Sequence, residues 1–507
     1  MAEAHREIER KYESSDSGLP DLTGTAGIAA VLDKGLVELD ATYYDTPDQR
    51  LTAASLTLRR RTGGADAGWH LKFPVAPGVR DEIQAPLSDT VPDGIAALVR
   101  SRVRGAELIP VVRLRSARDV RHLVDADGTL LAEASVDTVT ADRLTAAGGT
   151  AQWTEIEVEL ADGGDPAFLD QVEKRLRKAG VRPSASASKL ARALTETSED
   201  RRTTGRRKAP KDKASKPPAT AGDHVLRYLR AQRDALVALD PAVRRDVPDS
   251  VHRMRVATRR ARGTLRTFRA VLDRTATAQV AVELKWLAGE LGVDRDQEVL
   301  AERLTSALDA LPPHLVHGPV QDRLGTWARA RHHSTHGHVT AVLDSRRYLT
   351  LLDTLDALLT DPPLRRAAAK KPEKVLDKAV REDVAKLAGL VERAIARPPG
   401  EERDLALHEA RKKAKRTRYA AEAAAPALGD PADALARAAK ALTTLLGDHQ
   451  DGVMARRTLR ELAAVAHAAG ESTFTYGVLY GGQEARAAAA EADLPAAWER
   501  IRSGAYG

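Results

Sequence analysis

Charged side chains occupy every second position in several short segments of the first 160 residues. Because successive side chains of a strand point to opposite faces, each set lies on one face of its strand. The residues between them are mostly apolar, so the pattern predicts a sheet with an apolar outer face and a charged inner face. The sets are Glu7, Glu9 and Lys11 in EIERK, Arg59 and Arg61 in LTLRRR, Arg113 and Arg115 in VVRLRS, and Glu155, Glu157 and Glu159 in TEIEVEL.

The signs of these charges are segregated along the chain. The first and last segments are rich in acids, whereas the segments between them carry mostly Arg or Lys. The wetted face of an open sheet usually mixes both signs, and charges inside a closed barrel are costly unless they are matched. A polyanion would match the bases, and a divalent cation would match the acids. Carboxylate ligation without Cys or a suitable His cluster suits Mg²⁺ or Mn²⁺ rather than Zn²⁺.

A second charged pattern follows helical spacing in the later half of the chain. Residues 252–269 hold seven Arg and no acid, and many of these Arg recur three or four positions apart, on one face of a helix about 27 Å long. HRMRVATRRAR (252–262) aligns with HEARKKAKRTR (408–418), and LGVDRD (291–296) aligns with LGDHQD (446–451). The repeat predicts a duplicated helical bundle. Like charges four residues apart repel without a counterion, which favours a bound polyanion over a solvated face.

Nucleic acid is the rival partner for these basic helices. Reading or stacking on bases would need Asn, Gln or aromatic side chains among the basic residues. The 252–269 face offers only Phe268. We therefore expect a phosphate chain without bases, and no sequence-specific nucleic acid.

The chain of 507 residues is too long for one core. Alternating segments, with helical stretches around 93–104 and 166–197, fill a first domain at 1–198, and helical periodicity fills a second at 222–507. Between them, 199–221 is basic, contains Pro and has no aliphatic residue beyond Ala, which is typical of a linker. The expected fold class is α+β and multidomain.

Cysteine is absent, so the chain has no disulfide framework and no thiolate chemistry. No window approaches the ~20 apolar residues that a membrane-spanning helix needs. We expect a soluble, cytoplasmic protein without a membrane partner.

The first domain resembles the CYTH superfamily, the triphosphate tunnel metalloenzymes. The resemblance is carried by the ExExK motif at 7–11, YYDTPD at 43–48, the Arg pairs, the EIEVE strand and SKLARAL at 188–194, in the family's order. It covers roughly residues 1–197. It implies an eight-stranded antiparallel tunnel that binds triphosphate with its bases and a metal with its acids.

The resemblance also implies roles for individual residues. Glu7, Glu9 and Lys11 would be catalytic, with Lys11 contacting phosphate or positioning water. The metal ligands would be Glu7, Glu9, Asp137, Glu155 and Glu157. The triphosphate-binding residues would be Arg59, Arg61, Lys72, Arg80, Arg113, Arg115 and Lys189. Metal and guanidinium groups would neutralise the phosphoryl oxygens, and a metal-bound water would be the nucleophile.

Several substrates remain open within that superfamily, which includes inorganic triphosphatases, thiamine triphosphatases, adenylate cyclases and RNA triphosphatases. No obvious aromatic clamp for a thiazole or an adenine is present, although Trp69 or Trp153 could provide one. Inorganic triphosphate is favoured by elimination. The alternative class is a non-catalytic polyphosphate-binding or targeting protein. The acidic set favours the enzyme, because a pure phosphate binder gains nothing from repulsive carboxylates.

The second domain resembles the CHAD domain over roughly residues 222–507. The resemblance implies two four-helix bundles related by pseudo-twofold symmetry, with basic helices that bind inorganic polyphosphate, and it allows an association with polyphosphate granules. One departure is Gln450, which stands where the first repeat has Arg295. The matching positions are His252, Arg255, Arg259, Arg260, Arg262, His408, Arg411, Lys412, Lys415, Arg416 and Arg418.

Overall fold

The chain forms two compact units, divided between Ala214 and Ser215. The structure, a computed structural model, describes residues 4–14, 18–145, 148–198 and 218–506, without the side chains of 293–298 and 331–335. Most of the predicted linker therefore lies outside the described residues. Among the described residues, no helix has the length and apolar character needed to span a bilayer.

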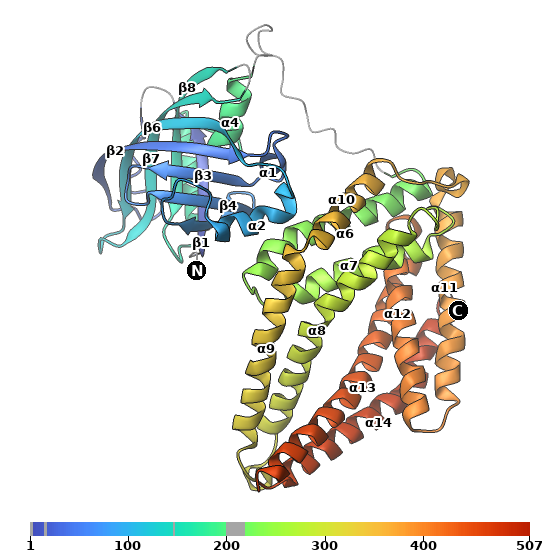
Figure 1. Cartoon of the computed structure of the whole chain (residues 1–507). Helices are drawn as coiled ribbons and strands as arrows, with labels where there is room; N and C mark the ends of the chain where they lie inside the picture. The colour runs from blue at the N-terminus through green and yellow to red at the C-terminus, as the bar shows by residue number, and fades with distance from the viewer. Residues whose placement is uncertain (1–3, 15–17, 146–147, 199–217, 507) are drawn as a thin grey trace. The chain divides into compact units, whose positions relative to one another are not determined.

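A closed antiparallel β-barrel forms the first unit (Figure 1). The strands follow the order β5-β4-β3-β2-β6-β7-β8-β1, and pairing of β5 with β1 closes the barrel. A two-residue strand, β9 (Arg182–Pro183), extends the sheet beside β1. The barrel confirms the predicted fold of this half. Its strands are β1 (Ala4–Glu13), β2 (Ala30–Asp45), β3 (Thr57–Thr62), β4 (Gly68–Ala76), β5 (Val79–Ala85), β6 (Ile109–Val124), β7 (Leu130–Arg143) and β8 (Thr150–Leu160).

Helices cover the apolar outer face of the barrel. The short helix α1 (Arg50–Ala53) and α2 (Asp93–Val103) lie over a core that includes Leu58, and α3 (Ala167–Lys178) lies over another that includes Ile156. Both of these strand residues alternate with charged neighbours. The predicted apolar outside is therefore present on these strands.

The predicted helical stretch 166–197 is two helices rather than one. Helix α3 ends at Lys178, Gly180 follows with a φ of +86°, and α4 (Lys189–Glu196) begins after Ser188. The Ser188 hydroxyl caps α4 by accepting a hydrogen bond of 3.1 Å from the Ala191 amide. Leu190 of α4 packs on inward-facing apolar residues of the barrel, so α4 closes part of its interior.

The second unit is all-helical. Helix α6 begins at a capping box formed by Thr220 and Asp223. Helices α6 to α10 pack together as a first bundle and α11 to α14 as a second, and α7 of the first packs on α12 of the second. The repeated sequences occupy equivalent helices, because the basic repeats lie in α7 and α12 and the LG repeats in α8 and α13. The helices are α6 (Ala221–Arg244), α7 (Ser250–Thr267), α8 (Ala278–Asp309), α9 (Val320–Asp344), α10 (Arg346–Thr360), α11 (Pro372–Ile395), α12 (Glu401–Leu428), α13 (Asp430–Ala468) and α14 (Phe474–Arg502).

Candidate functional site

A cavity of about 250 Å³ lies inside the barrel and is lined almost entirely by charged side chains. The register explains this lining: Tyr43 pairs with Arg59 across β2 and β3, and Lys72 pairs with Glu82 across β4 and β5, so all four face inward. The cationic lining residues are Lys11, Arg59, Arg61, Lys72, Arg80, Arg118 and Lys189. The carboxylate lining residues are Glu7, Glu9, Asp66, Glu82, Glu133, Glu157 and Glu159.

Three buried carboxylates gather around the ammonium group of Lys189, which lines this cavity, and of the three only Glu157 belongs to the lining itself. The side-chain oxygens of Asp137, Glu155 and Glu157 lie within 4.8 Å of one another. The Lys189 Nζ lies 2.8 Å from Asp137 Oδ2, 2.9 Å from Glu155 Oε1 and 2.5 Å from Glu157 Oε1. Burial alone would lower the pKa of Lys189, but the three carboxylates outweigh it and raise the pKa.

The donors of this cluster fit a divalent metal that prefers oxygen. All three are carboxylates, and their spacing lets them turn toward one ion, which is the chemistry of a Mg²⁺ or Mn²⁺ site. In the structure Lys189, Arg118 and Lys11 together pair with these carboxylates. Burial would raise the pKa of Glu157, but Lys11, Lys189 and Arg118 hold it well below its usual value, so this carboxylate is ionised and able to bind a cation.

The ExExK residues divide between two positions. Lys11 bridges Glu9, at 3.0 Å, and Glu157, and so joins the N-terminal strand to the carboxylate cluster. Glu7 lies apart, where both of its oxygens accept hydrogen bonds from Lys72 Nζ, at 2.7 and 2.6 Å. Burial raises the pKa of Glu7 to about 7, against the opposing effect of Lys72. Three of the five predicted metal ligands, Asp137, Glu155 and Glu157, thus form one group. Glu9 is joined to this group only by the ion pairs of Lys11, and Glu7 is separate from it.

Arg113 and Arg115 do not lie in the cavity, which corrects their predicted placement. Tyr43 faces inward and pairs with Val112, so the alternate residues of β6 face outward. The two side chains are half exposed, and they pair outside the barrel with Asp40 and Asp142. At this end of the barrel the inner face is apolar, because Val112 and Leu114 pack with α4.

The residue of β6 that does reach the cavity is Arg118. Its Nη2 donates to Glu157 Oε2 at 2.8 Å, and its Nε donates to Asp137 Oδ1 at 2.7 Å. The sequence did not predict Arg118 as a cavity residue, because no charged residue stands two positions before it to show which face of the strand lies inward. It shares its face with Ser116 and Leu114, so only the register reveals it.

Sequence reasoning also missed part of the acidic lining. Glu82 stands two residues after Arg80, so strand alternation could have placed it on the inner face. Its carboxylate accepts from buried His70, at 2.9 Å, and lies 3.7 Å from Arg59. With the missed acids included, and without the outward Arg pair, the described lining holds seven bases and seven carboxylates. The segments between the acidic strands carry mostly Arg or Lys, yet the described lining has no excess of bases.

Substituting Arg118 and Arg113 separately tests this placement on one strand. In an assay of the triphosphatase activity that the CYTH resemblance implies, Arg118→Ala, which removes an inward guanidinium, should lower kcat/KM about tenfold or more, as the loss of a charged hydrogen-bond donor predicts. Arg113→Ala removes an outward charge and should leave kcat/KM within about twofold of the wild type. Steady-state phosphate release measures both, and equal losses in the two variants would contradict the placement.

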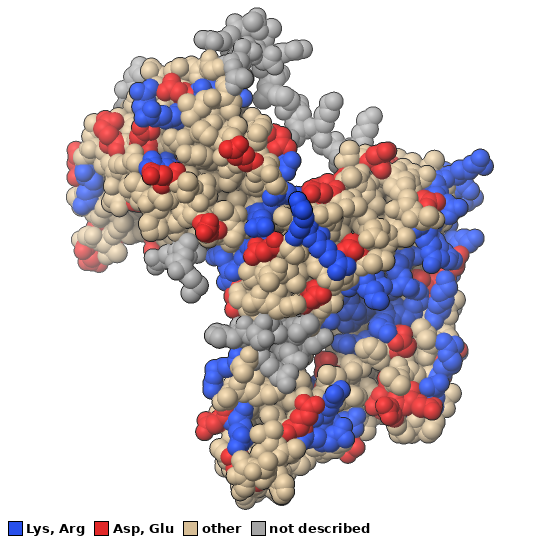
Figure 2. Space-filling model, viewed as in Figure 1, with Lys and Arg blue, Asp and Glu red and all other residues tan. Residues whose placement is uncertain are grey.

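A basic cluster, defined by Arg255, Arg259, Arg262, Arg411 and Lys415, lies where α7 packs on α12. Burial and the positive charges of Arg259, Arg411 and Arg255 together lower the pKa of Lys415 to about 7, against the opposing effect of Asp451. The bases of the two helices are therefore close enough to repel one another. Figure 2 shows Lys and Arg gathered on the visible face of this unit, over α7 and α12.

The glycines of the LG repeats make room for this cluster. A Cβ atom at Gly292 of α8 would lie 2.8 Å from the guanidinium of Arg255. One at Gly447 of α13 would lie 3.4 Å from the guanidinium of Arg411. The two copies of the repeat thus place an Arg over a Gly in the same way.

Other predicted polyphosphate ligands have acidic or polar partners. Arg260 and Arg418 both bond to Glu422, at 2.8 and 2.7 Å, and Arg416 bonds to Asp383 at 3.3 Å. The His408 ring lies 2.9 Å from the Gln450 amide oxygen, and Lys412 pairs with Glu409 at the surface. His252 lies on α7, where its ring is partly buried. These residues remain predictions as phosphate ligands.

Neither candidate aromatic clamp lines the cavity. Trp69 is fully buried on the outer face, where its ring lies 4.9 Å from that of Tyr44. Trp153 faces the α4 end of the barrel, and its Nε1 donates to Glu155 Oε2 at 2.6 Å. The described part of the cavity wall therefore offers only Tyr43 and the imidazole of His5 as ring side chains.

Two family models match the chain, the CYTH domain over residues 5–194 and the CHAD domain over 227–460. A protein of Mycobacterium tuberculosis (strain CDC 1551 / Oshkosh), named Uncharacterized protein MT2285, is 41% identical over 492 residues, which cover 94% of this chain and 92% of that protein. The Thiamine-triphosphatase of Macaca fascicularis is 28% identical over 188 residues, covering 36% of this chain and 74% of that protein.

A solved structure, the CHAD domain from the plant Ricinus communis, has 25% identity and a TM-score of 0.44, and it covers 59% of this chain and 98% of that one. The M. tuberculosis relative matches along nearly the whole chain, across both family models. The chain therefore belongs to the same family as that relative, and it carries a CYTH domain followed by a CHAD domain.

Proposed function

We propose that the barrel hydrolyses a triphosphate with the help of a divalent cation. The observation that carries the proposal is the charge of the cavity lining, in which bases and carboxylates are equal in number. Such a lining does not by itself neutralise a triphosphate, whose charge at neutral pH is several units negative. A cation bound to the carboxylates would free the bases to bind phosphate oxygens.

The residues of the chain would then act in two groups. Asp137, Glu155 and Glu157 would hold the cation, and Lys189 would exchange its carboxylate partners for a phosphate oxygen. Arg59 and Arg118, which are largely buried, would orient the phosphate chain and neutralise its oxygens. When bound, the divalent ion would supply Lewis-acid activation of phosphoryl oxygens and of water.

Inorganic triphosphate is the favoured substrate, because the described cavity wall offers little for a base or a thiazole to stack on. Thiamine triphosphate is the second candidate, and the support for it is the match to a relative named Thiamine-triphosphatase. A cyclase would need a pocket for adenine, and the described lining, polar except for Tyr43, provides no surface for one.

Phosphate release from inorganic triphosphate, long polyphosphate, thiamine triphosphate and ATP, with Mg²⁺, with Mn²⁺ and with a chelator, tests this function. We expect metal-dependent release, fastest from inorganic triphosphate. Faster release from thiamine triphosphate would make that the substrate, and cyclic nucleotide from ATP would favour a cyclase. If no substrate released phosphate, the non-catalytic binding protein would remain.

For the helical unit, we propose binding of inorganic polyphosphate by the basic cluster. The repulsion among these half-buried bases supports it, because a polyanion would relieve the repulsion that helps to depress the pKa of Lys415. This proposal includes a cytoplasmic location and an association with polyphosphate granules. Fluorescence microscopy of the tagged chain, with and without polyphosphate synthesis in the cell, tests the location.

The pKa of Lys415 predicts a pH dependence of this binding. Lys415 faces Arg255 and Arg259 of α7, Arg411 of its own helix and Asp451 of α13. At pH 6 Lys415 is mostly protonated, whereas above pH 8 it is mostly neutral, and a bound polyanion raises its pKa. Affinity should therefore fall as pH rises through about 7, by at most about tenfold per pH unit for one linked proton.

Calorimetry in two buffers of different ionisation enthalpy should detect the linked proton as net uptake on binding. Lys415→Arg is the control, because Arg stays charged throughout this pH range. The terminal phosphates of polyphosphate also titrate near neutral pH, but they do so equally with both proteins, so a difference between the proteins reports on Lys415. The same pH dependence and proton uptake in this variant would exclude Lys415 as the linked group.

A further inference from the structure

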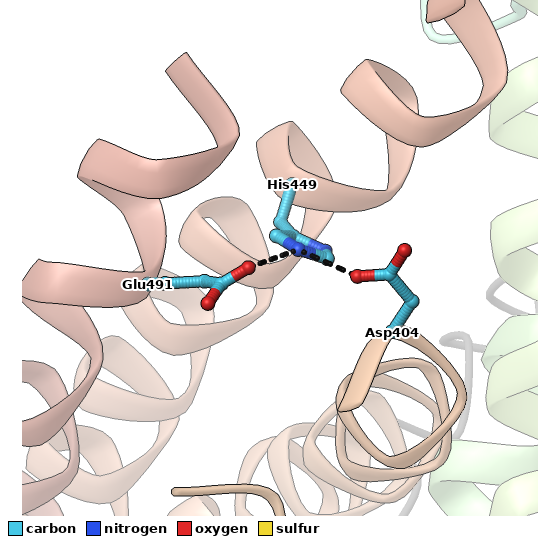
Figure 3. A group of neighbouring side chains, drawn as sticks. All are labelled: Asp404, His449 and Glu491. Carbon is cyan, nitrogen blue, oxygen red and sulfur yellow. Dashed lines mark hydrogen bonds and ion pairs between the residues drawn. The ribbon is translucent and has the colours of Figure 1, made fainter. Parts of the chain in front are cut away.

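Three helices of the second bundle bring a histidine and two carboxylates together (Figure 3). Asp404 comes from α12, His449 from α13 and Glu491 from α14. The Nε2 atom of His449 lies 3.3 Å from Asp404 Oδ1 and 3.0 Å from Glu491 Oε1. The His449 side chain is 2% exposed, whereas Asp404 and Glu491 are 26% and 17% exposed, so the histidine is buried and the carboxylates remain partly open to water.

The geometry places two anionic oxygens on a single ring nitrogen. That nitrogen carries at most one hydrogen, which one carboxylate can accept well and two can only share. Oxygen and nitrogen ligands lie about 2.0–2.2 Å from Zn²⁺ in proteins, which places neighbouring ligand atoms of a tetrahedral site about 3.3 Å apart. The two measured N···O separations are close to that value.

The outer oxygens of the two carboxylates have their own partners. The Nε atom of Arg403 lies 3.1 Å from Glu491 Oε2, and Arg456 Nη2 lies 4.0 Å from Asp404 Oδ2. Both contacts are ion pairs with the carboxylate oxygen that does not face His449, and the one with Asp404 is too long for a hydrogen bond. Partners of this kind orient the ligands of protein metal sites.

We propose that Asp404, His449 and Glu491 bind a first-row divalent cation, with Zn²⁺ as the best fit among the common ones. An imidazole together with two carboxylates suits Zn²⁺ better than Mg²⁺. The all-carboxylate cluster in the barrel has the opposite preference. Three protein ligands leave a fourth position for water. The sequence has Asp294 where the second repeat has His449, so we infer one such site per chain.

The site would fix α12 against α13 and α14 beside the basic cluster. His449 precedes Gln450, whose side chain bonds to His408 of α12. Asp404 lies one turn before His408 on the same helix. A bound cation would therefore stabilise the part of the second bundle that presents Arg411 and Lys415.

Equilibrium dialysis of the full chain against Zn²⁺ measures the number of Zn²⁺ ions bound per chain and their affinity, with no other ligand present. His449→Ala should lose one bound Zn²⁺ per chain, or bind it at least about tenfold more weakly. His467→Ala removes an exposed histidine from the same helix and should bind as the wild type does. A Glu155→Gln/Glu157→Gln variant removes the carboxylate cluster of the barrel and should keep the Zn²⁺ held by His449.

Two further measurements cover the case in which His449→Ala does not fold. Glu491→Gln preserves shape and should also lose the tight Zn²⁺. Co²⁺ added to the wild type should give visible absorption bands of a low-coordinate N/O site, which Glu491→Gln should lose. Absence of Zn²⁺ binding in the wild type, or equal stoichiometry and affinity in folded Glu491→Gln or His449→Ala, would overturn the proposal and leave an ion-pair network.

Discussion

Glu157→Gln should lower kcat/KM for metal-dependent triphosphate hydrolysis by at least about 100-fold. The Glu157 carboxylate lies within the cluster of three acids and contacts Lys11, Lys189 and Arg118. The substitution keeps the size of the side chain and removes its charge. It therefore weakens cation binding and leaves three neighbouring bases with one fewer carboxylate.

Phosphate release at saturating Mg²⁺ or Mn²⁺ measures the effect, and titration of the metal separates weak binding from slow chemistry. Restoration of the rate at high metal concentration would indicate a ligand role, whereas a low rate at all concentrations would indicate a role in positioning Lys189 or Arg118. Glu38→Gln, an exposed substitution on β2, is the matched control. A Glu157→Gln rate within about twofold of the control would contradict the assigned role.

The alternating charges correctly predicted which residues face the barrel interior in the strands whose inner face is charged and whose outer face is apolar. In β1 and β8 the residues between the acids, such as Ile8 and Ile156, pack under α3 as expected. In β6 the same alternation occurs with the faces reversed. Alternation indicates which residues share a face, but the neighbouring strands and helices decide which face is inside.

The reversal in β6 has a local physical cause that the sequence of the strand does not contain. Helix α4 supplies Leu190 and Ala193 to the barrel end, and the inner face of β6 is apolar where it meets them. Arg113 and Arg115 consequently face solvent. Beyond this contact the inner face of β6 becomes polar, and Arg118 enters the cavity.

The charge balance of the cavity was equally hard to predict. Glu133 lies among small residues in LLAEASV, with no alternating charge to mark its face. The site formed by Asp404, His449 and Glu491 was not predicted at all, because its residues lie on three helices and share no motif. In the helical unit, by contrast, the repeat placed Arg255 and Arg411 on equivalent helices correctly, since helical spacing and duplication are both visible in the sequence.

Arg255→Ala/Arg259→Ala should weaken polyphosphate binding by at least about 100-fold, since each lost contact of a guanidinium with phosphate is worth about 1.5–3 kcal/mol. The two residues face Lys415 across the contact of α7 with α12, and they help to depress its pKa. In the double variant the pKa of Lys415 should rise toward its usual value. The pH dependence of the remaining binding should therefore shift to higher pH, a change that simple unfolding would not produce.

The matched control is Arg457→Ala/Arg460→Ala, which removes the same charge from exposed positions on α13. This control variant should lower the affinity for polyphosphate only slightly, because it reduces the net positive charge of the helical unit without removing a base of the basic cluster. Binding measured at several salt concentrations separates the two variants further. Because each base that contacts phosphate releases counterions on binding, the slope of log affinity against log salt should fall by about one to two in Arg255→Ala/Arg259→Ala and stay nearly unchanged in the control. Equal affinities and equal slopes in the two variants would show that net charge, rather than the basic cluster, binds the chain of phosphates.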